Sequence, residues 1–209
     1  MHPFDYIRDP AEIYRESFSI VEREAQLSAL SASEKIVATR MIHACGMVDL
    51  EQDMAFSEDA VAKGKAALEA GAVVYCDVEM VRSGIITKRL PDGVELACTL
   101  NDPRVADHAV KIGNTRSAAA VDFWDRLDGC IAVFGNAPTA LFRLLERLDE
   151  GAPKPAVVVG MPVGFVGAAE SKQALSENRH GLDYIVVHGR RGGSAIASAA
   201  LNALAGGLS

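Results

Sequence analysis

Short apolar runs alternate with stretches of helical character along most of this chain. Five runs have the length and continuous apolar character of buried strands, at 72–76, 96–100, 130–134, 156–159 and 184–187. Helical patterns follow at 103–112, 115–127, 138–148, 168–177 and 194–205. Strands that are apolar on both faces and joined through helices are typical of a parallel sheet covered on both sides. The pattern predicts an α/β fold with a mostly parallel five-stranded sheet.

Two more helices precede this pattern, and capping residues mark their ends. Asp9 stands before a proline and begins the first helix, while Ser31 with Glu34 three residues later forms a capping-box pattern for the second. Gly46 offers a stop for that second helix. We expect an N-terminal helical segment and a single domain over 1–209, a length that suits one α/β core.

The charge of the chain disfavours several classes of partner. The formal net charge is -7, which argues against a broad basic surface for nucleic acid or for an anionic membrane. No apolar run approaches the roughly 20 residues that cross a bilayer, and no charged-then-apolar leader opens the sequence. The 4 cysteines stand far apart with no CxxC pair. We expect a cytoplasmic protein.

Glycines gather in the segments that follow three of the predicted strands, at 135–139, 160–172 and 188–194. Ligands bind beyond the carboxyl ends of parallel strands, and glycine turns before a helix present backbone N–H groups to an anion. Gly164 and Gly167, with the cations Lys172 and Arg190, are therefore candidates for binding carboxylates or phosphates. The plainer interpretation, in which the glycines only make tight turns, remains open.

The common nucleotide and hydrolase motifs are absent from the sequence. It contains no GxxxxGK[ST] loop and no GxGxxG that opens a first βαβ unit, which disfavours a dinucleotide. It contains neither a GxSxG elbow nor an HExxH helix, which disfavours serine hydrolysis and zinc peptidase chemistry.

Arg40 and His43 lie on one face of the second predicted helix, because residues three apart are neighbours on a helix. A guanidinium beside an imidazole could orient a carboxylate and deliver a proton to it. The guanidinium would lower the pKa of His43, whereas a bound anion would raise it. A histidine near the C-terminal end of a helix is also commonly a capping or core residue, so spacing alone leaves both interpretations open.

Asn114 and Arg116 belong to a predicted helix start in which Thr115 is the N-cap. The helix dipole opposes a positive charge in the first turn, which favours a functional explanation for Arg116. A solvated arginine is an equal alternative.

Four segments resemble the signature stretches of the precorrin-8X methylmutase family: 41–46, 112–119, 135–141 and 160–172. The likeness extends from residue 6 to about residue 205. The resemblance implies a flavodoxin-like three-layer α/β/α fold and a homodimer whose active site lies at or near the subunit interface. It also implies an isomerase of cobalamin biosynthesis that moves a methyl group on ring C of precorrin-8X, formally a 1,5-sigmatropic shift, to give hydrogenobyrinate. The reaction would need no metal, nucleotide or redox cofactor.

The resemblance also implies roles for three residues. His43 matches the family's proton donor and acceptor, and Ser17 and Arg40 match positions that contact substrate. Ser17 interrupts the apolar face of the first predicted helix, which a hydrogen bond to a ligand or to its own helix would explain equally well. Arg116, Lys172 and Arg190, with the amides of the glycine loops, are further candidates to hold the acetate and propionate groups of the macrocycle.

Two alternatives stay open beside this function. One keeps the enzyme class and changes the substrate to cobalt-precorrin-8 of the anaerobic route. The other is a non-enzymatic flavodoxin-like module that binds a phosphate or a flavin, which the fold alone could not exclude.

Overall fold

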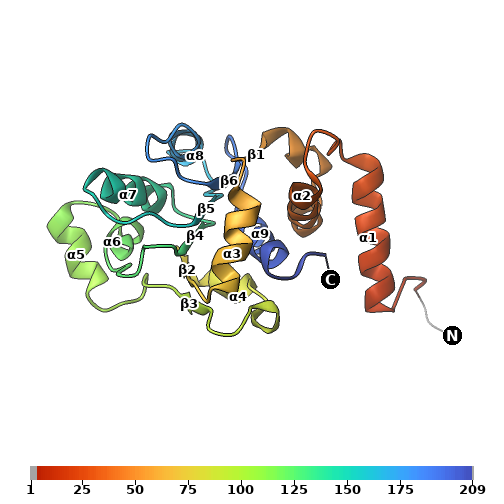
Figure 1. Ribbon diagram of the computed structural model, residues 1–209, viewed down its shortest axis with the longest axis horizontal. Helices are drawn as coiled ribbons and strands as arrows, with labels where there is room; N and C mark the ends of the chain where they lie inside the picture. Colours follow the sequence, from red (N-terminus) through yellow and green to blue (C-terminus); the bar gives the residue numbers. More distant parts are fainter. Residues whose placement is uncertain (1–3, 209) are drawn as a thin grey trace.

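The computed structural model describes residues 4–208, and one six-stranded sheet organises them (Figure 1). The strands are β1 (Met54–Phe56), β2 (Val73–Cys76), β3 (Glu95–Ala97), β4 (Ile131–Phe134), β5 (Val157–Gly160) and β6 (Tyr184–Val187). They lie in the order β1-β6-β5-β4-β2-β3. Strands β2 to β6 pair in parallel, and β1 runs antiparallel to β6.

The predicted strands are confirmed as β2 to β6, but the prediction of a five-stranded sheet is wrong by one strand. Numbered in chain order, the five parallel strands run 2-1-3-4-5, the order of flavodoxin-like sheets. The additional strand β1 is 3 residues long, half-buried and paired on one side with β6. Such a short edge strand lacks the continuous buried run by which the other strands are recognised. The sheet is therefore mixed.

Nine helices and two short 3-10 turns, η1 and η2, surround the sheet in the described residues. The elements are α1 (Pro10–Glu24), α2 (Ala32–Cys45), η1 (Val48–Asp53), α3 (Ala60–Glu69), α4 (Glu79–Gly84), η2 (Thr87–Arg89), α5 (Val105–Ile112), α6 (Arg116–Val121), α7 (Pro138–Asp149), α8 (Ala168–Ser176) and α9 (Ser194–Gly206). Between residues 4 and 208, no helix combines the length and the apolar character that crossing a bilayer requires.

Helix α6 ends at Val121, well before the predicted end at residue 127. Trp124 explains the difference: its ring stacks on Tyr75 with centroids 4.9 Å apart, and its Nε1 donates to Thr99 Oγ1 at 3.0 Å. These contacts with the sheet and with the segment after β3 outweigh the helical pattern of the local sequence.

The two faces of the sheet carry separate apolar clusters because successive strand residues point to opposite sides. Val74 contributes to the cluster under α3, α4 and α9, whereas Val73 contributes to the cluster under α7. Figure 1 shows α3 and α9 on one side of the sheet and α6 and α7 on the other, with α2 and then α1 stacked beyond α9. The N-terminal helices thus cover a helix and not the sheet itself.

Helix α9 lies between the sheet and α2, and every residue from Ile196 to Leu204 is buried. Most of these side chains are small, which lets α2 and the strands approach closely. The buried amide of Asn202 accepts from Ile86 N at 2.8 Å and donates to Gly84 O at 2.9 Å. Asn202 therefore fixes the end of α4 against α9.

Candidate active site

Helices α1 and α2 begin where the capping patterns predict. Asp9 accepts a hydrogen bond from Glu12 N at 2.7 Å. Ser31 and Glu34 form the full capping box at the start of α2, and Gly46 ends α2 in the left-handed conformation with φ 70°. These local signals hold both helices in register and so place one face of α1 against α2.

Ser17 of α1 and His43 of α2 meet between the two helices. The distance from Ser17 Oγ to His43 Nδ1 is 2.7 Å. The rings of Tyr14 and Phe18 pack against the imidazole, with centroid distances of 5.4 Å and 5.1 Å. If the hydroxyl donates to Nδ1, the proton of the neutral imidazole resides on Nε2. The sequence left two partners open for Ser17, a ligand or its own helix; in the structure this bond joins its hydroxyl not to α1 but to His43 of α2.

Arg40 lies one turn before His43 and is 5% exposed. Its Nε donates to Gly207 O at 2.8 Å, which holds the guanidinium in place. Burial lowers the pKa of Arg40, and the charge of Arg89 lowers it further. Burial likewise lowers the pKa of His43, with a second contribution from the charge of Arg40. The free protein therefore favours a neutral imidazole beside a fixed cation at neutral pH.

A pocket of about 420 Å³ opens beside these residues. Four helices contribute its lining: Tyr14 of α1, Arg40, His43 and Ala44 of α2, Met80 and Gly84 of α4, and Ala195, Ser198, Ala199 and Asn202 of α9. Because α9 starts just after the loop that follows β6, the pocket adjoins the carboxyl edge of the sheet. It offers an anionic ligand a positive charge and a titratable proton on one wall.

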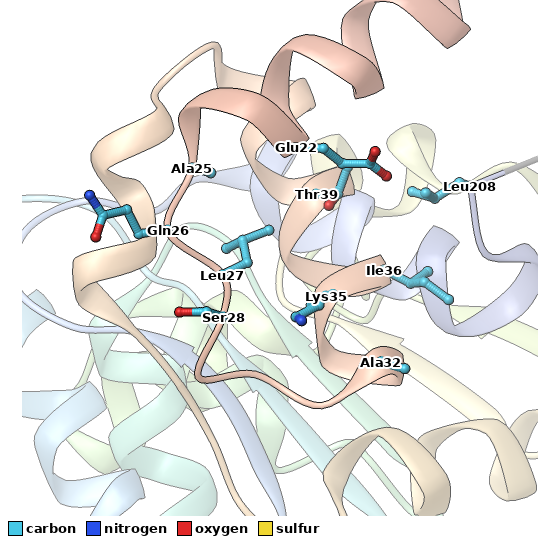
Figure 2. A pocket seen from close by; sticks show the side chains of 10 residues that line it. All are labelled: Glu22, Ala25, Gln26, Leu27, Ser28, Ala32, Lys35, Ile36, Thr39 and Leu208. Carbon is cyan, nitrogen blue, oxygen red and sulfur yellow. The ribbon is translucent and has the colours of Figure 1, made fainter.

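A larger cavity of about 670 Å³ lies where the α1–α2 turn and Leu208 flank α2 (Figure 2). Its described lining residues include the oppositely charged Glu22 and Lys35 but neither histidine nor arginine. Size alone would favour this cavity. The chemistry favours the pocket with His43, and we assign the candidate site there.

The backbone amides of the glycine loop after β4 are already occupied by the side chain of Asp77. Gly135 N donates to Asp77 Oδ1 at 2.9 Å, and the next two backbone amides each donate to Oδ2 at 2.9 Å. Asp77 is 3% exposed. Burial raises its pKa, while the amides of the loop oppose that change. Asp77 was not among the predicted site residues, although a carboxylate that directly follows a buried strand is a recognisable pattern.

Lys172 of α8 is 0% exposed and lies beneath the loop that follows β6. Its Nζ donates to Arg191 O at 2.6 Å. Burial lowers the pKa of Lys172 to about 8, and Asp53 opposes the change. Arg191 bridges to Asp53 at 2.6 Å and to Asp49 at 2.8 Å through its own guanidinium. The ammonium of Lys172 thus supports a loop and does not line the pocket of His43.

Gly164 and Arg190 meet at another part of the carboxyl edge, whereas Gly167 packs against α7. Gly164 N donates to Arg190 O at 3.2 Å, and the Arg190 guanidinium lies 5.3 Å from the centroid of the Phe165 ring. Phe165 is 83% exposed and its neighbour Val166 is 89% exposed. These residues form an exposed apolar tip with a cation beside it.

Asn114 lies between α5 and α6, and Arg116 is the first residue of α6. Figure 1 shows these two helices across the sheet from α1 and α2. Both residues are exposed; Asn114 Oδ1 accepts from Thr115 N at 2.7 Å, and Arg116 Nη2 donates to Leu100 O at 3.3 Å. Thr115 is the N-cap of α6 as predicted. Of the candidate residues, the structure brings together Ser17, Arg40 and His43, and it keeps the loop and flank candidates apart from them within one subunit.

A flavodoxin-ordered sheet with an imidazole and a buried guanidinium in one helical pocket defines an α/β protein whose pocket suits an anionic ligand. Residues 12–206 match the family model described as precorrin-8X methylmutase. The chain belongs to the precorrin-8X methylmutase family, a family of isomerases of cobalamin biosynthesis.

Similar proteins extend this match over nearly the whole chain. A precorrin-8X methylmutase from Sinorhizobium sp is 56% identical over 206 residues, which cover 98% of this chain and 98% of that protein. A cobalt-precorrin-8 methylmutase from Salmonella typhimurium is 41% identical, with 95% and 96% covered. The crystal structure of a precorrin-8X methylmutase from Thermus thermophilus superposes with a TM-score of 0.84 at 41% identity, covering 93% of this chain and 94% of that one. The expected enzyme class is confirmed.

Proposed function

We propose that the protein converts precorrin-8X into hydrogenobyrinate by moving one methyl group between adjacent carbons of ring C, formally a 1,5-sigmatropic shift. The observation that carries the proposal is the pocket lined by Arg40 and His43, with Ser17 hydrogen-bonded to the imidazole of His43. The Sinorhizobium relative named for precorrin-8X is 56% identical, against 41% for the Salmonella relative named for cobalt-precorrin-8. This difference favours the metal-free substrate over the cobalt-containing one.

His43 acts as the acid in this proposal. The polycarboxylate substrate raises the pKa of His43 on binding, so the imidazole takes up a proton and passes it to a nitrogen of the macrocycle. Protonation makes the conjugated system more electron-poor at the carbon that receives the methyl group. General acid catalysis of this kind supplies about 10²–10⁴-fold in rate. The proton returns to His43 after migration, so substrate and product have the same composition.

Ser17 can hydrogen-bond to His43 in both protonation states of the imidazole. Its hydroxyl donates to Nδ1 of the neutral imidazole and accepts from Nδ1–H of the imidazolium. The distance of 2.7 Å suits either direction. Arg40 supplies a fixed charge for one peripheral carboxylate of the substrate. Binding that holds the macrocycle in a shape favouring migration would supply the remaining acceleration.

We further propose that two copies of the chain complete the substrate site. Pockets for drug-sized ligands span about 300–1,000 Å³, and a tetrapyrrole with its acid side chains lies at or above the upper end of that range. The pocket of about 420 Å³ in one subunit therefore suits only part of the substrate. A second copy could bring Asn114 and Arg116, or the exposed tip at Phe165, over the remainder.

A direct assay tests the proposed reaction. Incubation of the purified protein with precorrin-8X is expected to change the visible spectrum while product mass equals substrate mass.

The variant His43→Ala should fold and bind the macrocycle, but its turnover rate should fall by about 10²-fold or more. Competition between metal-free and cobalt-loaded precursors decides the substrate. A flavin that co-purifies, with no spectral change of the precursor, would overturn the proposal in favour of a binding module.

The thiols support a cytoplasmic location for this reaction. Cys45, Cys76, Cys98 and Cys130 are all free in the structure. Unpaired cysteines are typical of proteins in reducing compartments.

A further inference from the structure

Backbone hydrogen bonds tie together the loops that follow β4, β5 and β6. Met161 N donates to Phe134 O at 2.8 Å, and Gly193 N donates to Met161 O at 2.9 Å. Gly193 is the N-cap of α9. We call the linked residues 134–137, 161–162 and 191–193 the strand-end shelf. The shelf thus runs from the centre of the sheet to the first residue of α9.

The shelf packs so tightly that two of its glycines leave no room for a side chain. A Cβ on Gly135 would lie 2.8 Å from Ser194 Cα in the first turn of α9. A Cβ on Gly192 would lie 2.4 Å from Met161 O, and Gly192 has φ 157°. Such close backbone contacts transmit a displacement of the shelf directly to the start of α9.

A buried acidic side chain supports one end of the shelf, and a buried basic side chain supports the other. The carboxylate of Asp77 binds the amides of residues 135–137, and the ammonium of Lys172 binds Arg191 O. Burying a charge is costly, and residues of similar volume without charge often give equal or greater stability. The two charges therefore call for a role beyond stability, and the backbone groups they bind belong to the shelf.

The helix held by the shelf forms one wall of the candidate site. Ala195, Ser198 and Ala199 of α9 line the same pocket as His43. His43 and Arg40 belong to α2, which the shelf does not include. A change in the shelf would thus act first on the start of α9, which is the wall that receives the substrate, and would reach His43 only through the packing of α2 on α9.

We propose that Asp77 and Lys172 are positioning residues for the methylmutase reaction, which act through the strand-end shelf to set the place of α9 in the substrate pocket. Neither side chain touches the substrate in this arrangement. Their effect appears in substrate binding and not in proton transfer. The kinetic consequence rests on the proposed function, whereas the effect on the shelf does not.

The variants Asp77→Asn and Lys172→Met test the proposal, with Asp122→Asn as the matched control. Asp122 is also a partly buried carboxylate; it accepts from His108 Nε2 and Arg143 Nε, both at 2.7 Å, away from the shelf. Each test variant should raise KM about tenfold and leave kcat within about twofold, the pattern of lost uniform binding. The KM of the control should stay at the wild-type value even where its stability falls by a similar amount.

Hydrogen exchange supplies a second measurement that needs no substrate. In both test variants, amides at 135–137 and in the first turns of α9 should exchange faster, while those of α1 and α2 stay protected. A wild-type KM in Lys172→Met, or exchange confined to the substituted residue, would overturn the proposal even if Asp77→Asn failed to fold. Wild-type protein that isomerises no tetrapyrrole would overturn the proposed function, and the exchange pattern would still decide the role of the shelf.

Discussion

Ser17 occupies Nδ1 of His43, so Nε2 is the ring nitrogen left to face a ligand. The same imidazole lies beside a cation that is buried and held by a backbone carbonyl. A ligand that neutralises Arg40 would remove one of the two causes that lower the pKa of His43. At the scale of single residues, the proposed binding of a carboxylate to Arg40 would therefore raise the pKa of His43.

Replacing Arg40 with methionine should raise the pKa of His43. The substitution removes the positive charge, which is the smaller of the two causes, and leaves burial, which is the larger. The pKa should rise but stay below the ordinary histidine value of about 6.5. NMR titration of the imidazole C2 proton measures it. Arg23→Met, an exposed arginine of α1, is the control and should leave the titration unchanged; an unchanged or lower value in Arg40→Met would contradict the coupling.

Replacing Ser17 with alanine should lower kcat/KM about fivefold, the equivalent of one hydrogen bond worth about 1 kcal/mol. The loss arises because nothing then orients Nδ1 in either protonation state. Steady-state kinetics with precorrin-8X measures the change. Ser19→Ala lies two residues further along α1, where the hydroxyl accepts from Arg23 Nη1, and it should retain wild-type kinetics. Equal losses in both variants would point to a general effect on α1.

Single residues differed in how far the sequence could locate them. The three-residue spacing of Arg40 and His43 placed both on one face of α2, and the structure brings Ser17 to the same point. The sequence shows Lys172 as a cation near a glycine loop. It does not show where the side chain points, because that depends on how α8 packs under the loop after β6. Asp77 was missed because its partners are backbone amides 58 to 60 residues away.

Elements with local signals were predicted well, and elements defined by distant partners were not. The capping box at Ser31 and the apolar runs of β2 to β6 each depend on residues that are close together in the sequence. Strand β1 exists because β6 pairs with it, and α4 exists because Asn202 of α9 holds its end. Six residues of α4 carry too short a pattern to be recognised from the sequence.

The variant Ser31→Ala should lower the free energy of unfolding by about 1 kcal/mol, because it removes the side-chain cap of α2. Chemical denaturation measures the change. Ser28→Ala in the exposed α1–α2 turn is the control and should have almost no effect. Kinetics of the folded Ser31→Ala protein should match wild type, since the cap lies at the opposite end of α2 from His43. An unchanged unfolding free energy would show that tertiary packing alone sets the start of α2.

At the scale of the whole molecule, the candidate residues divide between two flanks of the sheet. His43 lies with α1 and α2, and Arg116 lies at the start of α6 on the other side (Figure 1). The sequence motifs that suggested both residues contain no information about this separation. This separation is the reason for proposing that a second copy supplies one of the two residues to the substrate.

Mixing two inactive variants tests the proposed shared site. If the partner copy supplies Arg116, His43→Ala and Arg116→Ala chains that are denatured and refolded together should recover about a quarter of the wild-type sites, because half the dimers are hybrids with one intact site each. Each variant refolded alone is the control. Absence of recovery, with hybrid dimers confirmed by mass, would show that each subunit has a site of its own.

The pocket has residues of both α2 and α9 in its lining, so it can form during synthesis only after α9 has been made. Arg40 binds Gly207 across 167 residues of chain. A ribosome adds residues from the N-terminus at about 5–20 per second, so α1 and α2 emerge many seconds before their partner helix. Until residues 194–206 leave the exit tunnel, the apolar face of the nascent α2 lacks the helix that covers it in the folded protein.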